Sequence, residues 1–166
     1  MNYLKILIFS SLLAVNLMTL ATEKPVDTQN SVLELRYGVE SQAYFPQLSE
    51  FMITTQRQHT KLWFAGIGKK WELAGYALDA MEKNFDETAK YHPIFNKEVP
   101  LGSHLTKYLE KPLGDLRTSI DNKDGRFFKK SFNNLTSACN ACHIAENLRF
   151  IVVQKPTFLP FDNQKF

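Results

Sequence analysis

The sequence predicts an all-α domain, an antiparallel four-helix bundle with an extended C-terminal tail. From Pro46 onward, apolar residues recur at intervals of three and four along four successive segments, the period of helices with one buried face. Glycine, proline and Asp-Gly signals separate these segments. No segment alternates convincingly between apolar and polar residues, so no sheet is expected. Successive amphipathic helices joined by short turns pack as an antiparallel bundle.

The first helix is expected over Pro46–Gly66 and the second over about Lys69–Lys90. Gly66 and Gly68 favour an end to the first helix, and Pro93 closes the second. The apolar face of the first helix comprises Leu48, Met52, Thr55, His59, Leu62, Trp63 and Gly66. The stripe of the second comprises Trp71, Ala74, Leu78, Met81 and Phe85.

The third helix carries a leucine-rich stripe, and the fourth is expected over about Arg126–Arg149. The stripe comprises Leu101, Leu105, Leu109, Leu113, Leu116 and Ile120. Pro112 lies inside this pattern. Because proline lacks an amide hydrogen and its ring clashes with the preceding turn, we expect it to kink or divide the third helix. Asp124-Gly125 marks the turn before the fourth helix.

The N-terminal residues 1–21 have the pattern of a secretory signal peptide. Lys5 precedes an apolar run, and Thr19-Leu20-Ala21 offers small residues at the −3 and −1 positions of a cleavage site. Asn16 and Thr19 interrupt the run before it reaches the ~20 apolar residues of a membrane span, which favours cleavage over an anchor. Residues 22–45 are expected to form a polar leader, and 46–166 the folded domain. We therefore expect a periplasmic protein without a stable membrane span after cleavage.

Composition and charge exclude several classes of protein. The chain has 166 residues, a length typical of one domain. Its 44% hydrophobic and 22% charged residues argue against a disordered chain, a collagen-like repeat and a polytopic membrane protein. The formal net charge of +3 is too small for the dense basic stripe that duplex DNA requires, so no nucleic-acid partner is expected.

The candidate chemistry lies in Cys139-Asn140-Ala141-Cys142-His143, which has the CxxCH pattern of c-type haem attachment. Cysteines three residues apart on a helix share a face, so both thiols can bond the two vinyl groups of one porphyrin. The adjacent His143 then supplies the proximal ligand to the iron. Haem is attached outside the cytoplasm, which agrees with the export signal. The sequence therefore predicts one haem c, attached to Cys139 and Cys142 and ligated by His143.

Three other uses of the cysteines fit less well. A redox-active CxxC is typical of a thioredoxin-like βαβ setting, which the pattern lacks. A zinc site needs four ligands, and no second CxxC or HxxxH completes one. A disulfide suits an oxidising compartment but leaves His143 unexplained.

The fourth helix places the motif in line with its apolar stripe. An arc of about 100° around this helix holds Phe128, Phe132, Leu135, Cys139, Cys142 and His143. The haem would therefore lie inside the bundle, and the phenylalanines are expected to form ordinary core.

A signal peptide, four helices and a single CxxCH on the last helix resemble the cytochrome c prime type of c-type cytochrome. Several stretches are also similar to a little-characterised group of bacterial monohaem cytochrome-like proteins. These stretches are Gln56–Gly66, Trp71–Ala74, Leu135–His143 and Pro160–Phe166, within a similarity that covers about Leu48–Phe166. The chain departs from cytochrome c prime in its long tail after Phe150, which carries two prolines and is expected to fold back over the bundle. Its third helix also looks shorter.

Two residues of the first helix compete for the distal position on the iron. Met52 lies near the start of this helix, which resembles the place where low-spin relatives of cytochrome c prime supply a methionine. His59 is the stronger intrinsic ligand, since imidazole binds iron readily. Both residues also suit ordinary core positions. We favour Met52, because a buried thioether needs no hydrogen-bond partner, whereas a buried imidazole does.

The remaining histidines and two lysines of the fourth helix are expected outside the core. His92 and His104 are expected in loops or on the surface. Lys129 and Lys130 lie away from the apolar stripe and are expected to form a solvated face, with docking of an acidic redox partner as the alternative.

These observations favour a periplasmic monohaem electron carrier rather than an enzyme. Its expected partners are periplasmic redox proteins and the haem attachment machinery, and a homodimer is left open because relatives of cytochrome c prime are often dimers. The leading alternative is a five-coordinate haem protein that binds NO or CO as a sensor or scavenger. A third hypothesis is a non-haem helical interaction module with a Cys139–Cys142 disulfide.

Overall fold

The computed structural model describes residues 44–95, 100–160 and 163–166. The chain divides into two units, Met1–Tyr44 and Phe45–Phe166, and all the described residues except Tyr44 belong to the second. The expected signal peptide and residues 22–43 of the expected leader lie outside the described residues.

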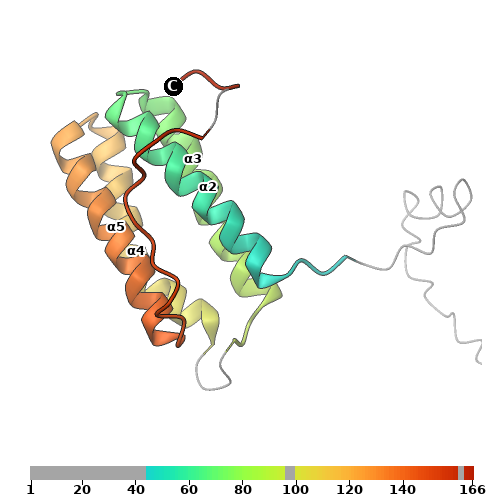
Figure 1. Cartoon of the computed structure of the whole chain (residues 1–166). Helices are drawn as coiled ribbons and strands as arrows, with labels where there is room; N and C mark the ends of the chain where they lie inside the picture. The colour runs from blue at the N-terminus through green and yellow to red at the C-terminus, as the bar shows by residue number, and fades with distance from the viewer. Residues whose placement is uncertain (1–43, 96–99, 161–162) are drawn as a thin grey trace, which may run out of the picture. The chain divides into compact units, whose positions relative to one another are not determined.

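Four helices form the second unit: α2 (Leu48–Ile67), α3 (Trp71–Tyr91), α4 (Leu101–Asp121) and α5 (Gly125–Ala145). Helix α2 packs along α3, α3 along α4, and α4 along α5, whereas α2 and α5 touch little. Figure 1 shows the resulting pairs, α2 with α3 and α4 with α5. The predicted antiparallel four-helix bundle is confirmed. None of the helices in the described ranges is long and apolar enough to cross a membrane.

The helices end in backbone motifs that make the short turns. Lys69, Lys123 and Asn147 have φ near +60°, the left-handed region of the Ramachandran plot, just beyond α2, α4 and α5. After each of these three helices, the amides of the left-handed residue and of the residue that follows it bond back to carbonyls of the last turn, as in Leu148 N to His143 O at 2.7 Å. This is the Schellman arrangement, which satisfies carbonyls that the helix leaves unpaired. The fourth helix accordingly ends at Ala145, so the expected end at Arg149 is wrong.

Helix α4 is continuous through Pro112, so the expected division of the third helix at this proline is wrong. All six stripe residues of α4 are buried, on both sides of the proline. Pro112 removes the amide that would bond the carbonyl of Tyr108, a loss of one helical hydrogen bond. Packing of apolar side chains before and after Pro112 outweighs that loss, and α4 has the 21 residues of α3 and α5.

One end of the bundle between α2 and α5 is filled by aromatic rings. Phe128 and Phe132 are fully buried, as expected for core. The Trp63 ring lies 4.9 Å from Phe132 and the Trp71 ring 6.1 Å from Phe128, centroid to centroid. Gly66 allows this close packing, since a Cβ there would overlap the Phe128 ring. The aromatic cluster holds α2 and α5 together at this end.

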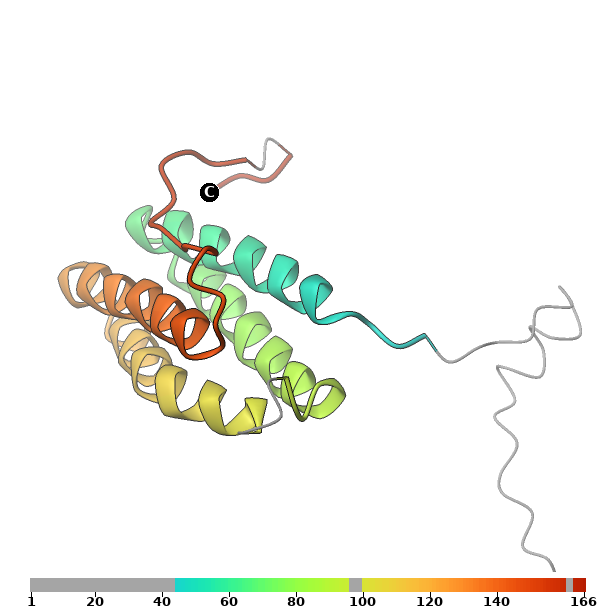
Figure 2. The same cartoon turned by 60° about the horizontal axis from the view of Figure 1, so that its bottom comes forward.

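The tail after α5 folds back over the bundle, as predicted. It runs in extended form along the gap between α2 and α5 in both views (Figures 1 and 2). Lys155 lies over the Trp63 ring, 5.3 Å from its centroid, and Phe166 packs against the core. The tail thus covers the side of the bundle where α2 and α5 stand apart.

Candidate functional site

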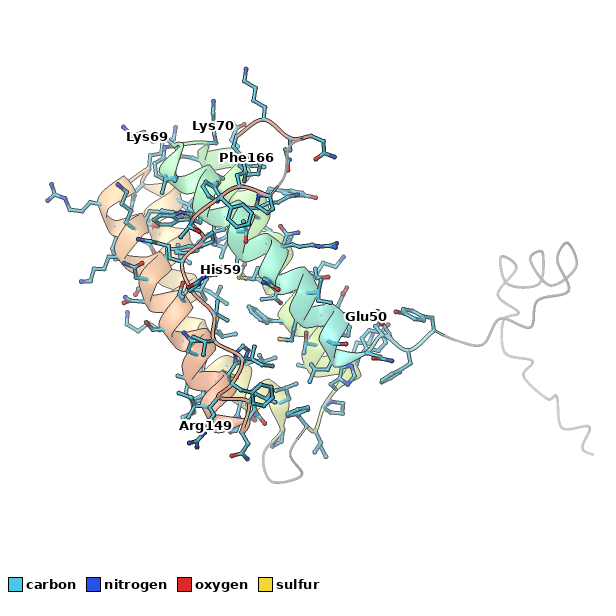
Figure 3. All side chains as sticks on the ribbon, in the orientation of Figure 1. Glu50, His59, Lys69, Lys70, Arg149 and Phe166 are labelled. Atoms are coloured by element: carbon cyan, nitrogen blue, oxygen red, sulfur yellow. The ribbon has the colours of Figure 1, made fainter. Side chains whose placement is uncertain are left out.

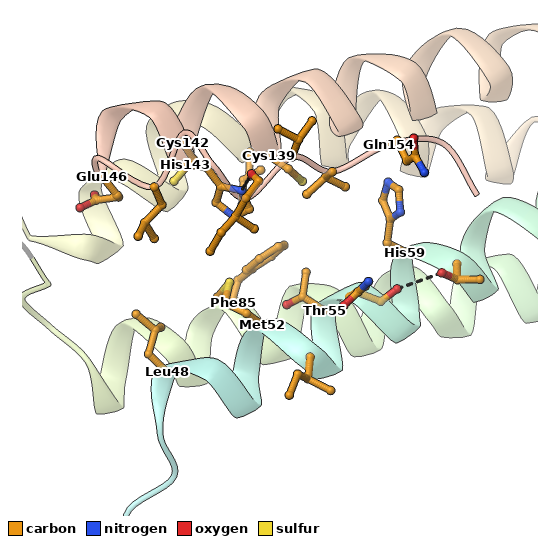
Figure 4. A pocket seen from close by; sticks show the side chains of 18 of the residues that line it. Leu48, Met52, Thr55, His59, Phe85, Cys139, Cys142, His143, Glu146 and Gln154 are labelled. Carbon is orange, nitrogen blue, oxygen red and sulfur yellow. Dashed lines mark hydrogen bonds between the residues drawn. The ribbon is translucent and has the colours of Figure 1, made fainter. Parts of the chain in front are cut away.

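A cavity of about 630 Å³ lies between α2, α5 and the tail, beyond the aromatic cluster. This is a typical size for cofactor sites, which span about 300–1,000 Å³. Its lining from the helices includes Leu48, Met52, Thr55, His59, Phe85, Leu101, Leu105, Leu109, Cys139, Cys142 and His143, and Glu146 lines it directly after α5. Figure 4 shows the cysteines and His143 on the α5 side and Met52 and Phe85 opposite them. Every candidate site residue predicted from the sequence therefore lines this one cavity.

Cys139 and Cys142 are free thiols on the cavity wall. Burial raises the pKa of the Cys139 thiol to about 12, with a contribution from Cys142. Burial, together with the charge of Glu146, raises the pKa of Cys142 to about 11. Redox-active cysteines have lowered pKa values, because the thiolate is the reactive form. The electrostatics of this pair are the opposite of those in an activated dithiol.

His143 is held in a defined tautomer by the tail. Its Nδ1 lies 2.9 Å from the carbonyl oxygen of Ile151. Because a carbonyl only accepts hydrogen bonds, Nδ1 must carry the proton. Nε2 is therefore the nitrogen left to bind a metal as a neutral imidazole, the arrangement found in most histidine-ligated metal sites.

His59 lines the cavity but is tied into the core. Its Nε2 lies 2.9 Å from Oγ1 of Thr136, and that hydroxyl donates its own hydrogen to the carbonyl of Phe132. Nε2 of His59 must then be the donor. The imidazole also packs on the Phe132 ring at 4.4 Å, and the residue is 3% exposed. Burial lowers the pKa of His59 to about 4, so the ring is neutral at pH 7.

Met52 is half-buried on α2 and lines the cavity. Next to it, Asn84 of α3 donates hydrogen bonds to the carbonyl of Phe51 and to Oγ1 of Thr55, both at 2.8 Å. These bonds fix the turn of α2 that carries Met52 against α3. Figure 4 shows Met52 beside Phe85, on the wall of the cavity opposite the CxxCH residues.

The expectation of a loop or surface position is wrong for His104, whereas His92 lies in the loop directly after α3, as expected. His104 lies in the first turn of α4, where Nδ1 bonds the carboxylate of Glu146, and their side chains are 16% and 5% exposed. His92 caps α3 and is half-buried, with Nε2 at 2.9 Å from the carbonyl of Pro46. Sequence periodicity gave no signal for these long-range partners.

Sequence analysis also missed Asn140, the residue after the first cysteine of the motif. Its side chain bonds the backbone of Val153 in the tail, at 2.8 Å to the carbonyl and 2.7 Å from the amide. An amide side chain between the two cysteines of the motif carries no sequence signal for this role.

The charged side chains lie outside the cavity, apart from Glu146. Lys129 and Lys130 are exposed on α5, as expected. Figure 3 shows Lys69, Lys70 and Arg149 at the periphery and His59 between the helices. Within the described ranges, no three His, Cys, Asp or Glu side chains gather into a group that could hold a metal ion.

Comparisons with models of protein families, with curated proteins and with solved structures find no match to this chain.

Proposed function

We propose that this chain is a monohaem c-type cytochrome that transfers electrons in the periplasm. The observation that carries the proposal is the meeting of the CxxCH residues at one cavity, with Nδ1 of His143 protonated and Nε2 left for a metal. A chance CxxCH would have no reason to line a cofactor-sized cavity. The resemblance to cytochrome c prime and the signal peptide pattern point the same way.

The residues present fit a haem. Two thiols lie on one wall, where they are available for thioether bonds to vinyl groups. Their high pKa values keep them protonated, so they would not exchange disulfides readily at pH 7. The opposite wall offers Leu48, Phe85 and three leucines of α4, apolar surface for a porphyrin.

Each residue has a stated task in this proposal. Cys139 and Cys142 would hold the haem covalently, and His143 would ligate its iron as the proximal residue of the motif. Met52 is the proposed distal ligand, with His59 as the alternative. The bound haem supplies the one-electron redox couple. The leucines and the tail exclude water, which fixes the dielectric surroundings that tune the potential.

The proposal includes partners as well as the cofactor. Haem attachment machinery would form the thioether bonds, and periplasmic redox proteins would donate and accept electrons. Lys129 and Lys130 stay the candidate docking residues for an acidic partner, because their side chains are exposed on the helix that carries the motif. A nucleic-acid partner is not proposed, and a homodimer is left to measurement.

The first test is covalent attachment in a host that matures c-type cytochromes. Wild-type protein should retain haem staining after denaturing electrophoresis, and the double variant Cys139→Ala, Cys142→Ala should lose it. His143→Ala should lose or distort the Soret band. Staining that survives in the double variant, or an unchanged spectrum in His143→Ala, would overturn the assignment.

The second test separates electron transfer from gas binding. A low-spin ferrous spectrum that does not respond to CO supports the carrier. A high-spin spectrum that shifts with CO supports an NO or CO binder instead. Absence of covalent haem, with Cys139 and Cys142 oxidised to a disulfide, leaves the helical interaction module.

A further inference from the structure

We propose that the C-terminal tail is part of the proximal haem site, and that Asn140 is the positioning residue that holds it there. The tail supplies the carbonyl of Ile151 to Nδ1 of His143, and Asn140 fixes the segment that carries this carbonyl. The effect on the iron rests on the proposed function, whereas the effect on the His143 tautomer does not.

Asn140 bonds the tail through both polar atoms of its side-chain amide. Nδ2 donates to the carbonyl of Val153 at 2.8 Å, and Oδ1 accepts from the Val153 amide at 2.7 Å. The pair reproduces the two-way bonding of one residue in a β-ladder. It uses both polar groups of Val153, so the extended tail is fixed in register as well as in place.

Ile151 lies between two anchors. On one side, Leu148 N bonds the carbonyl of His143 at 2.7 Å, and Ile151 N bonds the carbonyl of Leu148 at 2.8 Å. On the other side is the Asn140–Val153 pair, two residues further along the chain. With the backbone fixed before and after it, the Ile151 carbonyl has little freedom to leave Nδ1 of His143.

This contact controls which nitrogen of His143 can bind a metal. A proton held on Nδ1 leaves the Nε2 lone pair free and makes the imidazole a stronger donor. A stronger donor stabilises ferric over ferrous iron and lowers the reduction potential. Loss of the carbonyl would therefore raise the potential and let the proton move to Nε2 in a chain without haem.

The substitution Asn140→Ala tests this directly. Asn140 is half-buried on α5, and alanine favours the helix, so the bundle should fold as before. Asn134→Ala is the matched control, because Asn134 is exposed on the same helix. Asn140→Asp keeps an acceptor for the Val153 amide but loses the donor to its carbonyl, and should give an intermediate effect.

The first measurement uses the full chain made without haem attachment. Nitrogen chemical shifts of the His143 ring at pH 8 should show the proton on Nδ1 in wild type and Asn134→Ala. In Asn140→Ala the proton should redistribute toward Nε2, and the Val153 amide should exchange with solvent at least tenfold faster. An Nδ1 proton retained in Asn140→Ala overturns the proposal, whether or not the protein binds haem.

The second measurement is the reduction potential of the haem-loaded protein. Loss of an outer hydrogen bond to a ligating histidine changes metal affinity about tenfold or more. If the affinity of the histidine for ferric iron falls tenfold relative to its affinity for ferrous iron, the one-electron reduction potential rises by about 59 mV. We expect a rise of this size in Asn140→Ala and none in Asn134→Ala. Haem attached at an unchanged potential overturns the proposal and leaves the cytochrome function standing, whereas absence of haem in wild type overturns the function alone.

Discussion

Acidification should destabilise the bundle through His59. Burial lowers the pKa of His59 from 6.5 to about 4, so the folded state favours the neutral ring. The stabilisation is fully present above pH 6.5, the unfolded pKa, and is lost as pH falls toward 4. At pH 5 the two pKa values imply a ~30-fold shift toward the unfolded state, or about 2 kcal/mol. Most carboxylates are still ionised at that pH, which isolates the histidine.

The assay is urea unfolding of the haem-loaded protein, followed by circular dichroism at pH 7.5 and pH 5. Between pH 7.5 and pH 5 the free energy of unfolding should fall by about 2 kcal/mol more in wild type than in His59→Gln. Glutamine can keep a donor near Thr136 but does not titrate. The other histidines are present in both proteins, so their contributions to the pH dependence cancel in the comparison. Equal losses in the two proteins would refute the buried neutral imidazole at His59.

Three further outcomes are expected. Met52→Ala should turn the iron high-spin and open it to CO in visible spectra, and a low-spin spectrum would exclude Met52 as ligand. In thermal unfolding, Gly66→Ala should destabilise the fold by about 2 kcal/mol or more, because the new methyl group would overlap Phe128. Gly114→Ala, with open space around it, should instead raise the free energy of unfolding by about 0.5–1 kcal/mol. Without haem, Cys142 should react with iodoacetamide at pH 8 about 100-fold more slowly than an ordinary thiol, since its pKa is about 11 rather than 9, and the rate should rise about tenfold per pH unit to pH 10.

The helices were predictable because their apolar periods are long and unbroken. Every residue of the stripe from Leu101 to Ile120 is buried. The same apolar period predicted α3 and the buried aromatic face of α5. Pro112 misled the prediction, because its cost is local whereas the packing that overrides it comes from other helices. Asn147 in the left-handed conformation was a readable end signal for α5, since asparagine often substitutes for glycine there.

The candidate site was predictable only where a motif dictates spacing. CxxCH places two thiols and an imidazole within one turn and a half of helix, so the sequence alone predicted Cys139, Cys142 and His143, which line one cavity in the structure. The partner of the imidazole is a backbone carbonyl eight residues later, and any residue type at Ile151 would supply it. Asn140 acts through the backbone of Val153, which again leaves no pattern in side-chain identity.

The choice between Met52 and His59 also depends on contacts that no period reveals. The hydroxyl of Thr136, 77 residues away, accepts from the His59 ring, and the Phe132 ring packs against it. Movement of His59 to an iron would leave a buried hydroxyl without its donor, at about 1–3 kcal/mol, and would open a hole beside Phe132. Met52 has no such bond to break, because a thioether needs no hydrogen-bond partner. On this balance of free energies we propose Met52, rather than His59, as the distal ligand of the proposed haem.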